Sequence, residues 1–128
     1  MRFLCLAYGN EQKSAALTKS EMAKLGEQCS TYDEELRKTG RLVGSGSLDW
    51  GAKTLRLKKG KLTITDGPFI EAKELVGGFV IIEAADYEEA LKIASLHPAA
   101  RMGEELGWAV EVRPMGHCEL KVAAGIAT

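Results

Sequence analysis

A full set of signals for one long helix lies between Thr18 and Gly40. Thr18 and Glu21 have the spacing of a capping box, in which the threonine oxygen accepts a backbone N–H and the glutamate reaches back. Arg37 and Lys38 lie where the helix dipole favours cations, and Gly40 suits the left-handed residue after a helix end. Apolar residues at spacings of three and four predict one buried face: Met22, Leu25, Cys29, Tyr32 and Leu36. The helix therefore needs a sheet or another helix to pack against.

Short apolar segments on both sides of this helix predict strands, and the arrangement occurs twice. Residues 3–8 precede the helix and residues 42–48 follow it. Further along the chain, strands predicted at 76–84 and 108–112 enclose a second helix at 86–97, which Pro98 stops near His97. The chain thus contains two strand–helix–strand units.

A β-hairpin is predicted between the two units. Residues 54–58 and 62–65 alternate apolar and polar side chains and are joined around Lys59-Gly60. Leu55, Leu57, Leu62 and Ile64 would then share one face while the charged residues face water. The whole order predicts an α+β protein with a ferredoxin-like β-α-β-(β-hairpin)-β-α-β fold and both helices on one face of the sheet.

The second face of such a sheet lacks a cover within the chain. Strands centred on Phe3, Leu55, Ile64, Ile81 and Val110 offer more apolar surface than two helices cover. The simplest partner is a second copy, so we expect a homodimer.

The charge balance argues against specific nucleic-acid binding. The chain has 17 basic and 18 acidic residues, whereas nucleic-acid binders usually carry a strong basic surplus. One basic run, from Lys53 to Lys61, contains no acid, and solvated side chains on an exposed hairpin explain it most simply.

Cysteine usage and the N-terminal residues favour a cytoplasmic protein that is not bound to a membrane. Cys5, Cys29 and Cys118 form no CxxC pair, and no segment approaches the ~18 apolar residues of a membrane span. The histidines and cysteines are scattered, so no metal site is predicted. No organic cofactor is predicted either. We expect one domain over residues 1–115 and a flexible tail over 116–128.

The segment from Asp66 to Glu83 carries a recognisable motif. It has the sequence Asp-Gly-Pro-Phe-Ile-Glu-Ala-Lys-Glu-Leu-Val-Gly-Gly-Phe-Val-Ile-Ile-Glu, and His97-Pro98 and Glu111-Val-Arg-Pro follow in order. This pattern resembles the signature of the DGPF branch of the YCII-related proteins. The resemblance extends over about residues 1–115.

The resemblance implies a dimeric α+β barrel, in which two ferredoxin-like sheets enclose a cleft. The activity of the wider family is largely uncharacterised. Some members have a His-Asp pair suggestive of acid–base catalysis, and others resemble companions of extracytoplasmic-function sigma factors. This sequence departs from the His-Asp pattern, because Cys29 falls near the family's histidine position and His97 falls at its aspartate position.

Asp66 and His97 are the candidate catalytic residues. A carboxylate and an imidazole within hydrogen-bond reach would give a general base without metal or organic cofactor. Each has a structural alternative: Asp66 could accept backbone N–H groups in its own turn, and His97 could be a helix C-terminal residue favoured by the dipole.

The candidate ligand-binding residues lie close to these two in the sequence: Phe69, Glu71, Lys73 and Arg101. Glu71 and Lys73 could bind an anionic or zwitterionic molecule, or could hold their loop by an ion pair. Arg101 could clamp a carboxylate or phosphate. Phe69 could be a stacking platform for a ligand or, more simply, a hydrophobic plug.

Two hypotheses of function follow. In the first, a homodimer binds a small polar molecule in a cleft, with cofactor-independent acid–base catalysis as an extension. In the alternative, a regulatory protein without enzymatic activity engages a component of transcription, with the basic hairpin as the contact.

Overall fold

The structure is a computed structural model that describes residues 1–120, and four strands form its central sheet. These are β1 (Arg2–Asn10), β2 (Leu42–Ser47), β5 (Glu74–Glu83) and β6 (Ala109–Pro114). Their order across the sheet is β2-β5-β1-β6, with antiparallel neighbours throughout. This is the ferredoxin-like arrangement, so the predicted α+β fold is confirmed.

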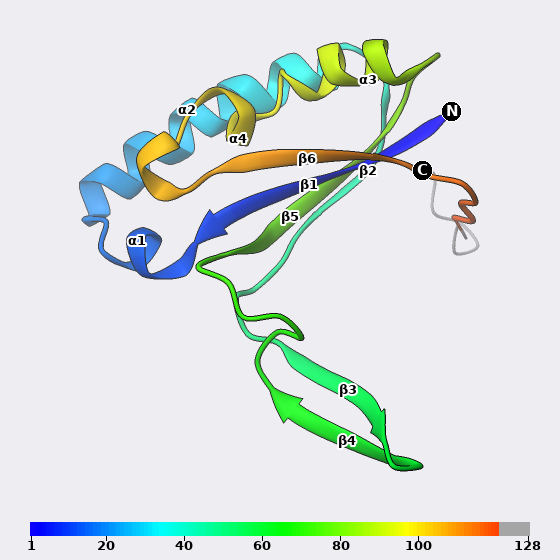
Figure 1. The fold of residues 1–128 in the computed structure, drawn as a ribbon. Helices are drawn as coiled ribbons and strands as arrows, with labels where there is room; N and C mark the ends of the chain where they lie inside the picture. Colours follow the sequence, from blue (N-terminus) through cyan, green and yellow to red (C-terminus); the bar gives the residue numbers. More distant parts are fainter. Residues whose placement is uncertain (121–128) are drawn as a thin grey trace, which may run out of the picture.

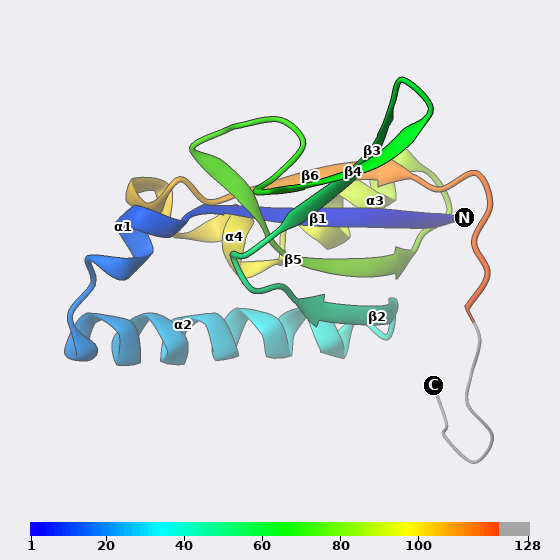
Figure 2. The same cartoon turned by 90° about the horizontal axis from the view of Figure 1, so that it is seen from below.

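The helices α2 (Lys19–Lys38), α3 (Tyr87–Ala94) and α4 (Pro98–Arg101) lie on one face of this sheet (Figure 1). Figure 2 shows the molecule from below, after a turn of 90°, and there α2 runs along the edge formed by β2. A short 3-10 helix, η1 (Glu104–Leu106), precedes β6. One further short helix, α1 (Glu11–Ala15), follows β1 directly.

The ends of α2 form as the sequence predicts, but its apolar face is used only in part. The Thr18 hydroxyl accepts the Glu21 backbone N–H at 3.1 Å, and Gly40 follows the helix with a φ of 71°. Leu36 is buried, whereas Met22 remains 52% exposed. The C-terminal half of α2 therefore supplies most of its packing.

The second predicted helix is divided in two at Pro98. The first part, α3, ends at Ala94, and Pro98 is the first residue of α4, where its missing N–H and fixed φ suit a helix start. His97 is thus the N-cap of α4, and its side chain accepts the Ala99 backbone N–H. The expectation that His97 ends a helix is wrong, because proline is tolerated at a helix start and not inside one.

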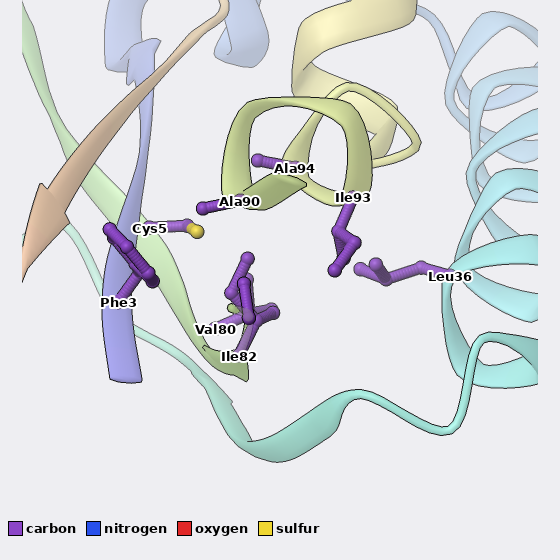
Figure 3. Close-up of a cluster of buried hydrophobic side chains, with 9 residues drawn as sticks. Phe3, Cys5, Leu36, Val80, Ile82, Ala90, Ile93 and Ala94 are labelled. Atoms are coloured by element: carbon purple, nitrogen blue, oxygen red, sulfur yellow. The ribbon is translucent and has the colours of Figure 1, made fainter. Parts of the chain in front are cut away.

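The hydrophobic core fills the space between the sheet and α3 (Figure 3). Phe3 and Ile82, neighbours across β1 and β5, are fully buried, and Ala90 of α3 packs on them. Leu36 reaches the same cluster from α2 and lies toward Ile93. Aliphatic side chains thus dominate the core.

A second, two-stranded sheet projects from the first on the side away from the helices (Figure 1). It consists of β3 (Lys53–Lys58) and β4 (Lys61–Asp66), and we call residues 53–66 the arm. Lys59 and Gly60 both have positive φ, as a two-residue hairpin turn requires. The predicted hairpin is confirmed.

Exposed apolar side chains gather on the arm rather than on the central strands. Leu55 pairs with Ile64 and Leu57 with Leu62, and all four are 61–71% exposed. Ile81, expected on an uncovered sheet face, is only 8% exposed. The apolar surface that lacks a cover is therefore chiefly the arm.

Most of the predicted tail, residues 116–128, lies outside the described residues. Within residues 1–120, Arg2 donates to the Cys118 sulfur at 3.6 Å, so the first tail residues contact the start of β1. No helix in this part of the chain has both the length and the apolar character to span a membrane.

Candidate functional site

A cavity of about 420 Å³ lies where the core ends, between the helix-bearing face of the sheet and α2. Its lining combines one acid, one arginine, one histidine and two tryptophans with several small side chains. This volume is within the usual range of small-molecule sites. The residues that line it are far apart in the sequence, from Ala7 of β1 to Trp108.

The floor of the cavity consists of small residues on the central strands. Ala7 of β1 lies beside Gly78 of β5, and Ser47 of β2 lies on the other side of Gly78. Ser45, opposite Val80, adds a second hydroxyl. Because none of these side chains is longer than serine, the space above them stays open.

The helix α2 contributes Cys29, Asp33 and Arg37 to the cavity. They are four residues apart in turn, which places them along one stripe of the helix. Asp33 and Arg37 form no ion pair with each other among the described contacts, although this spacing would allow one. Both charges remain available to a bound molecule.

The imidazole of His97 enters the cavity in a fixed orientation. Its Nδ1 accepts the Ala99 backbone N–H at 3.0 Å, so the neutral ring carries its proton on Nε2. Burial lowers the pKa of His97 below its ordinary value of 6.5, and the charge of Asp33 acts in the opposite direction. At neutral pH the cavity therefore meets a neutral imidazole with an N–H donor.

Asp33 also acts on Cys29. Burial raises the pKa of the Cys29 thiol, and the Asp33 charge raises it further. The thiol is therefore protonated near neutral pH and is a poor nucleophile. The charge of Asp33 thus acts on the pKa of both the Cys29 thiol and the His97 imidazole.

The predicted pair of Asp66 and His97 does not meet within one chain. Asp66 ends β4, its side chain is 87% exposed, and its carboxylate contacts Lys53 Nζ at 2.9 Å. It is not among the residues that line the cavity of His97. A pairing of Asp66 with His97 across two subunits stays a prediction.

The predicted ligand-binding residues also lie elsewhere in the chain. Glu71 and Lys73 line an open depression in the loop after β4, and the Arg56 guanidinium lies 5.2 Å from the ring centre of Phe69. Arg101 contacts Glu35 at 2.6 Å and lies over the Tyr32 ring, tying α4 to α2. None of the four lines the cavity of His97.

The sequence interpretation missed Asp33, Arg37 and the two tryptophans. One signal was present: Cys29 belongs to the predicted inward face of the helix, and the stripe of that face continues through position 33. A carboxylate on an otherwise apolar inward stripe points to a polar cavity. Trp50 gave no such signal, because it lies in a loop whose path depends on the tertiary fold.

The chain belongs to the YCII-related domain family, whose pattern matches residues 1–115. It is 32% identical over 96 residues to an uncharacterised protein of Rhizobium meliloti (strain 1021), covering 73% of this chain and 77% of that protein. Among solved structures it is similar to 5-chloro-2-hydroxyhydroquinone dehydrochlorinase from Burkholderia phenoliruptrix AC1100, in complex with 2,5-dihydroxybenzoquinone. That similarity has 18% identity, a TM-score of 0.47 and coverage of 92% of this chain and 96% of the other. The predicted family membership is confirmed.

Proposed function

We propose that this protein binds a small polar molecule in the cavity beneath α2 and catalyses proton transfer there without a metal or organic cofactor. The observation that carries the proposal is that Asp33 and His97, brought from α2 and the start of α4, line one cavity of suitable size. A carboxylate and a neutral imidazole in one partly buried site form an acid–base pair of complementary roles.

The hydrogen bond to Ala99 assigns those roles. Since Nδ1 of His97 accepts a backbone N–H, protonation of that nitrogen would break the cap of α4. The imidazole therefore serves as a hydrogen-bond donor through Nε2. Asp33 is the group left to accept a proton, so it is the general base and His97 is the donor to the developing oxyanion.

The reaction class that fits is proton abstraction next to a carbonyl group. The substrate C–H bond breaks, its proton moves to the Asp33 carboxylate, and its electron pair forms the C=C bond of an enolate. The enolate oxygen carries the negative charge and accepts the hydrogen bond from His97 Nε2–H. Asp33 then returns the proton to the same or a neighbouring carbon, so no oxidant or reductant is needed.

Deuterium exchange tests this assignment without a known substrate. We expect the protein to speed exchange of the α-protons of acetylacetone, oxaloacetate or phenylpyruvate in D₂O, followed by proton NMR. Asp33→Asn should reduce the rate by about 100-fold or more, which is typical of removing a general base. Asp66→Asn is the matched control and should leave the rate unchanged. Exchange lost in D66N and kept in D33N would restore the predicted Asp66 site and refute this proposal.

The proposed active form is a homodimer, with the arm of each chain packed on a second copy. The arm exposes four aliphatic side chains on one face, and an isolated two-stranded hairpin is only marginally stable in water. Charge favours the same partner. The arm holds five basic residues and one acidic residue, a net charge of +4, whereas the other 12 basic and 17 acidic residues give the rest of the chain −5. The rest of a second copy therefore carries a net charge opposite to that of the arm, which favours their association.

Light scattering at micromolar concentration tests the dimer. We expect a dimer that Leu57→Glu dissociates, because a charge would be buried against the partner. Thr65→Glu is the control, since the register places Thr65 on the other face of the arm. A wild-type protein that is monomeric under these conditions would contradict the proposal.

The cytoplasmic location stays a prediction, and none of the proteins similar to this chain supports the regulatory alternative.

A further inference from the structure

Both tryptophans of the chain line the cavity, although they are far apart in sequence. Trp50 lies in the loop between β2 and the arm, and Trp108 lies just before β6. The chain has only two tryptophans and 6% aromatic residues in all. A sequence with so few aromatic side chains thus places its two largest at one site.

Each indole packs against a glycine that leaves room for it. A Cβ on Gly9 would lie 3.2 Å from Trp50 Cη2 and 3.4 Å from Trp108 Cδ1, so the two rings converge over this position. A Cβ on Gly103 would lie 2.3 Å from Trp108 Cδ2, which no real side chain permits. The glycines let both rings lie close to the backbone, and the rings become fixed walls of the cavity.

Arg37 provides the cavity with a cation that has no carboxylate partner among residues 1–120. By contrast, Arg2, Arg41 and Arg101 each contact a glutamate within 3.3 Å. Arg37 is exposed and lies one helical turn beyond Asp33, at the edge of the lining. A guanidinium in this position suits bidentate binding of an anionic oxygen pair.

We infer that the substrate is a small, planar, conjugated molecule that carries an anionic group, with its flat face against the indoles of Trp50 and Trp108 and its anion on Arg37. Aromatic walls favour flat π-systems by offset stacking, and the volume of about 420 Å³ admits a single ring with its substituents. This inference rests on the cavity of the proposed function. It adds the substrate class, which the Asp33 and His97 chemistry leaves open.

Three small probes separate planarity from charge. Benzoate is planar and anionic, cyclohexanecarboxylate has the same charge without the planar ring, and benzamide is planar and uncharged. Because both tryptophans line the cavity, quenching of intrinsic fluorescence reports binding directly, and calorimetry gives an independent dissociation constant. We expect benzoate to bind about three- to tenfold more tightly than either of the other probes.

Variants then assign each preference to its residue. Trp50→Leu should remove the preference for benzoate over cyclohexanecarboxylate, and Arg37→Gln should weaken benzoate by about tenfold while leaving benzamide unchanged. Arg113→Gln, on β6 and outside the cavity lining, is the matched control and should bind all three probes as the wild type does. Equal affinity for benzoate and cyclohexanecarboxylate, no binding of benzoate at all, or an R37Q variant with wild-type affinity would overturn the inference.

Probe binding and deuterium exchange test the substrate class and the proposed proton transfer separately. Benzoate binding with the expected preferences, in a protein that promotes no deuterium exchange, would refute the proton-transfer chemistry and support the substrate class. Exchange that depends on Asp33, without any preference for planar probes, would do the reverse.

Discussion

The space between the helices and the sheet is filled at one end and hollow at the other, although the same strands form both. Along β1 the inward side chains are Phe3 and Cys5 at the filled end and then Ala7. Along β5, Ile82 and Val80 give way to Gly78. The two ends differ mainly in the size of the inward side chains, so the cavity arises where the inward side chains of the strands are too small to fill the space.

The side chains that the helices turn toward the sheet also differ between the two ends. At the filled end, α3 presents Ala90, Ala94 and Ile93, which pack closely on the sheet. At the hollow end, α2 presents Asp33 and Arg37, whose burial in a packed core would be unfavourable. The sheet and α3 therefore hold the fold together, and the hollow end is left to bind a molecule.

The same substitution at the two ends is the strongest test of this contrast. Ala90→Leu adds bulk to a fully buried position, and we expect it to lower the free energy of unfolding by about 3 kcal/mol, near the upper end for overpacking. Ala7→Leu adds the same bulk at the cavity, where space exists, and should change that free energy by about 1 kcal/mol or less. Urea unfolding followed by circular dichroism measures both.

Probe binding completes this test. Ala7→Leu should abolish the binding of benzoate, because the new side chain occupies the cavity floor. If Ala7→Leu destabilises the protein as much as Ala90→Leu, the hollow end is as tightly packed as the core, and the contrast is wrong.

The fold was predictable because its signals are local. The capping box at Thr18 and the turn at Lys59-Gly60 each depend on residues within a few positions, and both form as expected. Short apolar segments and apolar alternation likewise predicted the strands. Pro98 is the exception, because a proline can either end one helix or begin the next. The residues around Pro98 do not decide between these two structures.

The candidate site was less predictable, because its residues meet only through tertiary structure. Asp66 lies in the most distinctive motif of the chain, yet it ends the arm and pairs with Lys53. His97 was identified, but its partner in the cavity is Asp33, which is 64 positions earlier. A distinctive motif indicates the family and does not by itself indicate which side chains share a cavity.

The smallest expected effect is a dependence of stability on pH that originates at the hollow end. Burial lowers the pKa of His97 in the folded protein below its ordinary value of 6.5, so below about this pH the unfolded chain binds a proton more readily than the folded chain. The stability linked to His97 is fully present above pH 6.5 and declines as the pH falls through the lowered pKa of the folded state.

Urea unfolding of the wild type, His97→Asn and His117→Asn between pH 4.5 and 7.5 isolates the contribution of His97. Asparagine cannot titrate in this range, but its side-chain oxygen still accepts the Ala99 N–H as an N-cap. His117 is 83% exposed, so its replacement should leave the wild-type slope intact. We expect the H97N variant to lose less stability on acidification than the other two, because it lacks the imidazole that the unfolded chain protonates more readily than the folded chain. Parallel curves for H97N and the wild type would mean that His97 is protonated as easily in the folded chain as in the unfolded one. The imidazole would then be a cation at mildly acidic pH, and its role as a neutral hydrogen-bond donor would be restricted to higher pH.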